Sequence, residues 1–162
     1  MNQSLQNNNA EKKLVLLKKR ALYYLGKREY SRKELHEKIT PFSESLELTR
    51  QQVNQILTEL ESKDWLSDRR FADQFVFSKK RKFGLKKMEY ELKMRGVNEI
   101  IIHNALNEIK SEEYNLAKNI WEKKFRKLPE NPEERLKQMR FLQSRGINSA
   151  LIHQILSGKL SE

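Results

Sequence analysis

Apolar residues recur with a helical spacing along most of the chain, and one such pattern occurs twice. The two copies are LKMRGVNEIIIHNAL, residues 92–106, and LQSRGINSALIHQIL, residues 142–156. In each copy a helix pattern stops at Arg-Gly, because glycine readily takes the left-handed conformation that ends many helices. The asparagine two residues later, Asn98 or Asn148, is a good N-cap for another helix. Both copies therefore predict a helix, a tight corner at Gly96 or Gly146, and a second helix.

A fainter third copy lies upstream, at residues 53–60. Its apolar positions repeat, at an offset of 49 residues, the spacing of those that follow Asn98. The Arg-Gly corner is replaced there by the longer segment ITPFSESLEL, in which Pro41 opposes continuation of a helix. We therefore expect the helix before this segment to end at Ile39 and the repeat to survive with an insertion.

These signals together predict nine helices in three groups of three. The first group has a helix over residues 12–29, a second from the Ser31–Glu34 capping box through Ile39, and a third that begins at the Thr49–Gln52 capping box. The second group has a helix from Ser67 or Asp68 to about Phe83, a second from Leu85 to Arg95, and a third that begins after Asn98. The third group has a helix capped by Ser111 that runs to about Lys127, a second opened by Asn131 and Pro132, and a third after Asn148.

The expected fold class is all-α, with three tandem three-helix repeat units forming an elongated curved array. Each group of helices is too small for a large core, so such units stack on their neighbours. The predicted organisation is a disordered tail at residues 1–10, followed by repeats at residues 11–64, 65–110 and 111–162.

Charge narrows the possible partners. The chain of 162 residues contains 33 Lys and Arg against 22 Asp and Glu, which gives a net charge of +11 and favours a polyanion or an acidic surface as partner. It has no cysteine, and no apolar run reaches the roughly 18 residues of a membrane span. We therefore expect a cytoplasmic protein with no membrane contact and no disulfide.

Signatures of catalysis are missing from the sequence. The GKRE segment at Gly26 lacks the upstream glycine of a phosphate-binding loop. His103 and His153 occupy equivalent positions of the repeat beside its apolar stripe, where a packing role is far more common than a metal role, and His36 has no ligand partner at helical spacing. We expect no catalytic residue, no cofactor and no metal.

The strongest functional signal is a basic cluster at one helix-to-helix corner, SKKRKFGLKK, which no acid interrupts. A solvated helix end is the plain interpretation, because cations also suit the negative end of a helix dipole. The functional interpretation of the cluster is contact with phosphates or with an acidic protein surface. The predicted binding residues are Lys79, Lys80, Arg81, Lys82, Lys86 and Lys87, with Lys93 and Arg95 before the first corner and Lys123 and Lys124 in the third repeat.

Three segments carry a resemblance to a known family: ALYYLGKREYSRKEL, LTELESKDWLSDRRFADQFV and ELKMRGVNEIIIHNAL. Their order and spacing resemble the RecX family of bacterial recombinase regulators over residues 15–157. The chain departs from the family pattern at Trp65, where a smaller aromatic is expected, and at Ser67, where a second acid is usual. The matching marks are Ala21, Leu22, Arg28, Ser31, Glu34, Leu35, Leu66, Asp68, Arg70, Phe71, Ala72, Gly96 and Val97, of which Asp68, Arg70 and Phe71 form the family motif.

The resemblance implies a monomeric, non-enzymatic protein that binds along the groove of the RecA–DNA filament and restrains its growth or activity. Its expected partners are the RecA filament, single-stranded DNA and, as a further candidate, double-stranded DNA. Two other classes remain open. One is a helix-turn-helix regulator that reads bases from Asn98 or Asn148, and the other is a helical adaptor whose positive charge is incidental.

Overall fold

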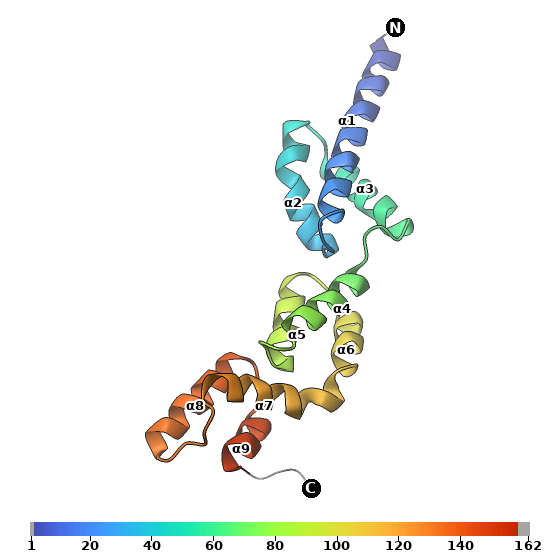
Figure 1. The fold of residues 1–162 in the computed structure, drawn as a ribbon. Helices are drawn as coiled ribbons and strands as arrows, with labels where there is room; N and C mark the ends of the chain where they lie inside the picture. The colour runs from blue at the N-terminus through green and yellow to red at the C-terminus, as the bar shows by residue number, and fades with distance from the viewer. Residues whose placement is uncertain (1, 159–162) are drawn as a thin grey trace. The chain divides into compact units, whose positions relative to one another are not determined.

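The computed structural model describes residues 2–158 and is all-helical over that range (Figure 1). The elements in chain order are α1 (Asn2–Leu25), α2 (Arg32–Ser45), α3 (Arg50–Ser62), α4 (Asp68–Lys79), α5 (Leu85–Met94), α6 (Glu99–Asn107), the short 3₁₀ turn η1 (Lys110–Glu112), α7 (Glu113–Lys124), α8 (Pro132–Ser144) and α9 (Ser149–Ser157). The nine α-helices of the described range fall in the three groups predicted, which confirms the all-α repeat fold.

The chain folds into two compact units. Unit 1 comprises residues 1–71 together with 95–97, and unit 2 comprises residues 72–94 together with 98–162. Neither unit coincides with a single predicted repeat, because α5 and α6 belong to unit 2 while the corner between them belongs to unit 1. The exact limits predicted for the three repeats stay predictions, and residues 159–162 lie outside the described range.

In unit 1, the helices α1, α2 and α3 enclose one apolar core. Leu17 and Ala21 of α1 are fully buried in this core. Ser31 caps α2, since its hydroxyl accepts a hydrogen bond of 3.1 Å from the Glu34 amide. Thr49 and Gln52 form the predicted capping box of α3. The remaining buried core residues are Tyr30, Leu35, Ile39, Val53, Ile56, Leu57, Leu60 and Leu66.

Three helix ends in unit 1 differ from the predictions, and one is the end of α1, which lies at Leu25 instead of residue 29. Helix α1 begins at Asn2, so residues 2–10 are helical where a tail was expected; that stretch contains neither Pro nor Gly, and nothing in it terminates a helix. Helix α2 continues through Pro41 to Ser45, so the stop predicted at Ile39 is wrong. Pro41 is exposed, and solvent can therefore hydrate the carbonyl that loses its amide partner.

The repeated Arg-Gly corners have the predicted conformation. Gly96 and Gly146 have φ angles of +75° and +79°, and the amide of Ile147 donates to the carbonyl of Leu142 over 3.2 Å as in a Schellman motif. Asn98 and Asn148 cap the helices that follow, with side-chain oxygens 2.8 Å from the Ile100 amide and 2.9 Å from the Leu151 amide. The helix–corner–helix interpretation of both copies is confirmed.

Each corner packs closely against the start of another helix. In unit 1, the Arg95 carbonyl accepts a 2.7 Å hydrogen bond from the Ser31 hydroxyl, just before α2. In unit 2, the Arg145 carbonyl accepts a 2.7 Å hydrogen bond from the Gly84 amide, just before α5. The repeated phrase therefore builds a turn that uses its own main chain to hold a neighbouring helix start.

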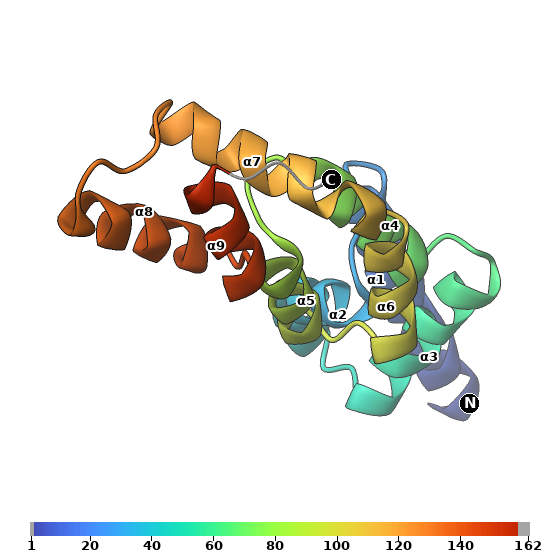
Figure 2. The same ribbon diagram turned by 90° about the horizontal axis from the view of Figure 1, so that it is seen from below.

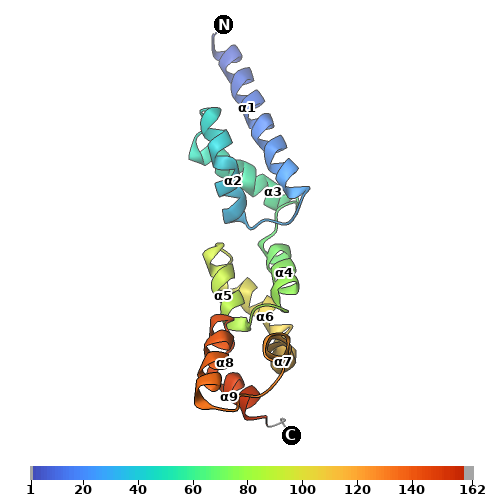
Figure 3. The same ribbon diagram turned by 60° about the vertical axis from the view of Figure 1, so that its left-hand side comes forward.

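Unit 2 contains α4 from Ala72 onward and the helices α5 to α9, and Figures 1 and 3 both place α5 beside the α8–α9 corner. Its third-repeat core contains a buried polar pair, in which Trp121 Nε1 donates to Gln138 Oε1 over 2.7 Å. Asn131 and Pro132 open α8 as predicted. Ser111 is not a cap, because it lies inside η1 and α7 begins two residues later without a side-chain cap. The buried apolar residues of this core are Ala117, Ile120, Trp121, Leu142, Ile147, Ile152, Ile155 and Leu156.

Candidate nucleic-acid interface

The basic corner spans a turn and the start of the next helix rather than one long helix end. Helix α4 ends at Lys79, four residues before the predicted limit, and the Phe83 amide folds back onto the Lys79 carbonyl over 2.9 Å. The first cations of the cluster therefore lie at a helix C-terminus, where the helix dipole favours them. Lys86 and Lys87 lie in the first turn of α5, where the dipole disfavours cations and no acid is present. Helix stability does not account for this second pair.

Arg81 and Lys82 converge with basic residues from the third repeat on one surface hollow of about 430 Å³, the basic hollow. The guanidinium of Arg145 lies 5.1 Å from the centre of the Phe141 ring, which itself packs edge-on against Phe125. Every charged residue of the lining is positive. The basic hollow is lined by Arg81, Lys82, Ile120, Lys123, Lys124, Phe141 and Arg145.

The structure thus brings four of the predicted cations together and adds one that the sequence interpretation missed. Arg145 belongs to the second Arg-Gly corner, which was interpreted only as a turn. The Arg145 carbonyl is held by the hydrogen bond from the Gly84 amide, while the Arg145 side chain lines the basic hollow. Its proximity to Arg81 depends on how the α4–α5 turn meets the α8–α9 corner, which local sequence does not encode.

A second hollow, the Tyr90 hollow, lies where α5 meets the α8–α9 corner, and Figure 2 shows α5 next to α9. Lys87 reaches across it, with its ammonium 3.3 Å from the Ser144 carbonyl and 4.6 Å from the centre of the Phe83 ring. Tyr90 is 61% exposed although it is a large aromatic residue. The lining residues are Lys86, Lys87, Tyr90, Gln143, Ser144, Gly146, Ile147 and Ser149.

Lys80 is separated from the other cations of the corner. It lines a third hollow, together with the carboxylates of Asp73 and Glu108 and the exposed ring of Phe77. Its ammonium lies 5.7 Å from the centre of the Phe77 ring. Lys79 is half-buried at the end of α4 and lines none of these hollows. The cluster that is continuous in sequence is therefore divided in space.

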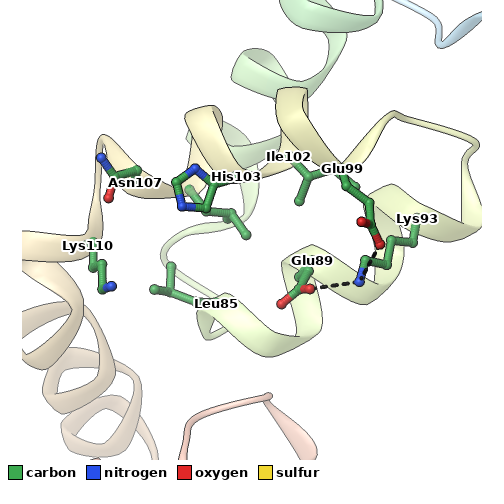
Figure 4. Close-up of a pocket in the computed structure, with 9 residues that line it drawn as sticks. Leu85, Glu89, Lys93, Glu99, Ile102, His103, Asn107 and Lys110 are labelled. Atoms are coloured by element: carbon green, nitrogen blue, oxygen red, sulfur yellow. Dashed lines mark ion pairs between the residues drawn. The ribbon is translucent and has the colours of Figure 1, made fainter.

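Lys93 and Arg95 are engaged in ion pairs. Figure 4 shows Lys93 between two carboxylates, with its ammonium 2.9 Å from Glu89 and 3.5 Å from Glu99. The hydrogen bond to Glu89 and the two negative charges raise the pKa of Lys93. Arg95 pairs with Glu34 over 3.2 Å within unit 1. Both predicted binding residues are thus compensated by local acids.

The hollow in Figure 4, about 410 Å³ between α5 and α6, is a weaker candidate for a polyanion. Its floor is apolar, and the two lysines on its rim are matched by two glutamates, so it presents no excess of positive charge. His103 lies on this rim, and His153 is exposed on α9. Within the described residues, no group of His, Asp and Glu has the arrangement of a metal site.

The family-motif residues stabilise unit 1. Asp68 accepts a 2.7 Å hydrogen bond from the Arg32 amide and so supplies a second cap at the start of α2. Arg70 pairs with Glu29 at 2.9 Å and with Asp64 at 2.8 Å. Phe71 is buried. Ser67, where the family pattern has a second acid, caps α4 by accepting from the Arg70 amide over 3.2 Å.

Comparison with known proteins identifies the family. The regulatory protein RecX of Chromobacterium violaceum is 39% identical over 142 residues, which cover 88% of this chain and 90% of that protein. The chain belongs to the RecX family. The regulatory protein RecX of Ralstonia pickettii is 37% identical, with coverage of 88% and 87%. Family models described as the second and third three-helix domains of RecX match residues 67–106 and 111–156.

Solved RecX structures have the same fold. The crystal structure of RecX from Lactobacillus salivarius superposes with a TM-score of 0.73 at 20% identity, over 91% of this chain and 96% of that one. A second RecX crystal structure gives a TM-score of 0.74 at 22% identity, over 90% of this chain and 73% of the other. Within residues 2–158, no helix is both long and apolar enough to cross a membrane.

Proposed function

We propose that this RecX-family protein is a non-enzymatic modulator of the RecA recombinase. It acts as a monomer in the cytoplasm, binds along the groove of the RecA–DNA filament and restrains filament growth and activity. Membership of a family of regulatory proteins supports this proposal, as does a net charge of +11 that suits a partner coated with phosphates. The contacts assigned to this function are protein–protein contacts along the filament and contacts between the basic hollow and the DNA backbone.

The observation that carries the DNA contact is the convergence of five cations on the basic hollow. Arg81 and Lys82 come from the α4–α5 turn, Lys123 and Lys124 from the end of α7, and Arg145 from the α8–α9 corner. Concentrating like charges costs free energy in the absence of a partner, and phosphates relieve that cost with release of counterions. Lys93 and Arg95 are left out of the proposed contact because nearby carboxylates already compensate them.

The first experiment tests the DNA contact. A variant with Arg81, Lys82, Lys123 and Lys124 changed to Gln should melt like wild type, because surface changes away from the core usually stay within ~0.5 kcal/mol per site. Its affinity for a single-stranded oligonucleotide should fall, and the slope of log affinity against log salt should flatten by about 0.7 for each lost phosphate contact. The control variant has Lys12, Lys19, Lys118 and Lys137 changed to Gln, which removes the same number of positive charges outside the basic hollow.

Equal losses in both variants would show that only net charge matters and would remove the assignment to the basic hollow. Loss of filament binding with unchanged binding to bare DNA would move the contact to an acidic surface of the protein filament. A helix-turn-helix regulator would instead prefer particular duplex sequences. Asn98 and Asn148, the base-reading candidates for that alternative, already use their side-chain oxygens to cap α6 and α9.

The second experiment tests the regulatory role. Co-sedimentation with RecA filaments formed on single-stranded DNA should recover the protein with the filament. Addition at well below one copy per RecA protomer should lower ATP turnover by DNA-bound RecA, while the protein alone should show no turnover. A protein that hydrolyses ATP unaided, or that leaves RecA turnover unchanged at equal concentration, would refute the proposed function.

A further inference from the structure

Tyr90 is an aromatic residue whose exposure is not explained by the packing of its own helix. The buried face of α5 consists of Met88 and Leu92, which are 1% and 0% exposed. Tyr90 lies off this stripe and leaves 61% of its surface open to solvent. A single exposed aromatic ring is common on protein surfaces, but Tyr90 lies in a hollow between lysines, and tyrosine is enriched at binding interfaces because it combines an apolar ring with a polar hydroxyl.

The surroundings of Tyr90 define the chemistry of that ligand. Lys86 lies one turn earlier on the same helix face, and Lys87 also lines the Tyr90 hollow. All charged residues of this lining are positive, and its remaining polar groups are Gln143, Ser144 and Ser149. Glu89 of α5 does not line the Tyr90 hollow, since it lines the separate hollow between α5 and α6.

A ring beside cations is the arrangement that single-stranded nucleic acids recognise. Bases of a single strand stack on aromatic side chains while lysines meet the backbone phosphates, and the stacking tolerates any sequence because every base has a π-face. In a duplex the bases are already paired and stacked, so an exposed tyrosine on a helix gains nothing comparable from B-form DNA.

We propose that Tyr90 is a base-stacking residue and that the Tyr90 hollow gives the protein a preference for single-stranded over double-stranded nucleic acid. The inference rests on the proposed DNA contact and adds a strand-specific subsite to it. The Tyr90 hollow and the basic hollow flank the same corner, because Ser144 and Gly146 line the first and Arg145 lines the second. A strand whose base stacks on Tyr90 can therefore pass its neighbouring phosphates to the basic hollow.

The test compares three oligonucleotides with equal numbers of phosphates: an oligothymidine, an abasic strand of the same length, and a duplex. Tyr90→Leu removes the ring but keeps an apolar residue with good helix propensity. We expect it to weaken oligothymidine binding by about 5- to 150-fold, the range for loss of one stacked base, and to leave abasic and duplex binding unchanged. Tyr90→Phe keeps the ring and should bind like wild type. The salt slope should be the same in all three proteins, because no phosphate contact is lost.

Phe77→Leu is the matched control. Phe77 is 75% exposed and lies beside Lys80, but Asp73 and Glu108 line the same hollow and repel phosphates. Its replacement should leave oligothymidine binding unchanged. The abasic strand tests the proposal on wild-type protein alone, so the answer does not depend on folding of the Tyr90 variant.

The outcomes separate this inference from the proposed function. If wild type binds oligothymidine and the abasic strand equally, or if Tyr90→Leu weakens duplex binding as much as single-strand binding, the stacking role is overturned while the phosphate contact stands. If the basic-hollow variant also binds all three oligonucleotides like wild type, the proposed DNA contact fails as well. A loss confined to strands with bases and to the Tyr90→Leu protein supports the inference.

Discussion

Replacing Gly146 by Ala tests whether the Arg-Gly corner is held by its close packing on α5. Gly146 has a φ of +79°, a region that costs an L-residue about 1–2 kcal/mol. A Cβ at this position would also lie only 2.4 Å from both the amide nitrogen and the Cβ of Lys87, and 2.9 Å from its Cα. Because these are atoms at the start of a helix, relief requires the main chain to move, which typically costs a further 1–3 kcal/mol. The expected loss is therefore about 2–5 kcal/mol.

Gly96→Ala is the internal comparison, since sequence alone suggests that the two corners should cost the same. Its φ of +75° imposes a similar conformational cost. The added Cβ would lie 2.8 Å from Cβ and 2.9 Å from Cδ of Lys33, both side-chain atoms, of which the outer one can move away. We expect Gly96→Ala to be destabilising, by about 1–3 kcal/mol, and less so than Gly146→Ala.

Gly26→Ala serves as the control in which a glycine is lost without strain. Its Cβ would make ordinary contacts, 3.4 Å from the Leu22 carbonyl and 3.7 Å from the Tyr23 carbonyl. We expect no loss and a gain of up to about 1 kcal/mol from the stiffer unfolded chain. Urea unfolding followed by far-UV circular dichroism measures all three. Stability of Gly146→Ala within ~0.5 kcal/mol of wild type would refute the close contact between the corner and α5.

Three further outcomes are expected. Gln138→Leu should destabilise unit 2 by about 1–3 kcal/mol, because the buried Trp121 indole N–H loses its acceptor. Trp121 fluorescence during urea unfolding, in a Trp65→Phe background, measures this loss. An unchanged unfolding midpoint would contradict the Trp121–Gln138 hydrogen bond. Asp68→Ala should cost about 0.5–2 kcal/mol through the uncapped Arg32 amide, with Asp68→Asn closer to wild type because it keeps an acceptor oxygen, as thermal melts would show. The pKa of Glu59 is lowered to about 2, first by the hydrogen bond from Lys18 and then by that from Lys63. The contribution of Glu59 to stability should therefore be complete above the ordinary carboxyl pKa of 4.5 and disappear as the pH falls through about 2. NMR titration should find the pKa of Glu59 raised in Lys18→Gln, and an equal pKa in both proteins would exclude the Lys18–Glu59 pair.

Local sequence predicted the parts of the fold that depend on local chemistry. The Arg-Gly corners and their asparagine caps follow from backbone conformation and from single hydrogen bonds within a few residues, and both are present. Pro41 shows where such rules fail, because an exposed position lets a helix tolerate a missing amide. Ser111 shows another failure, since a 3₁₀ turn took the place of the expected cap.

The candidate site was only partly predictable for a different reason. Residues 79–87 stood out as a run of cations, but their division among three hollows depends on contacts between segments about thirty to sixty residues apart. Lys93 was predicted as a binding residue like the other cations, but it forms ion pairs with Glu89 and Glu99 in the folded chain. The exposure of Tyr90 could be predicted, since Tyr90 falls outside the apolar stripe of α5. Its position beside the α8–α9 corner, which suggests a binding role, could not be predicted from local sequence.

The α8–α9 corner links packing to the proposed interface because its main chain and its side chains have different partners. The Arg145 carbonyl holds the Gly84 amide, while the Arg145 side chain lines the basic hollow and Gly146 lines the Tyr90 hollow. The two hollows are therefore joined by a main-chain hydrogen bond and a glycine contact instead of by flexible lysines. In the proposed interface, such a link would present both hollows to one strand at little entropic cost. It would also let a stretch with few charges organise a surface whose proposed binding groups come mostly from other segments.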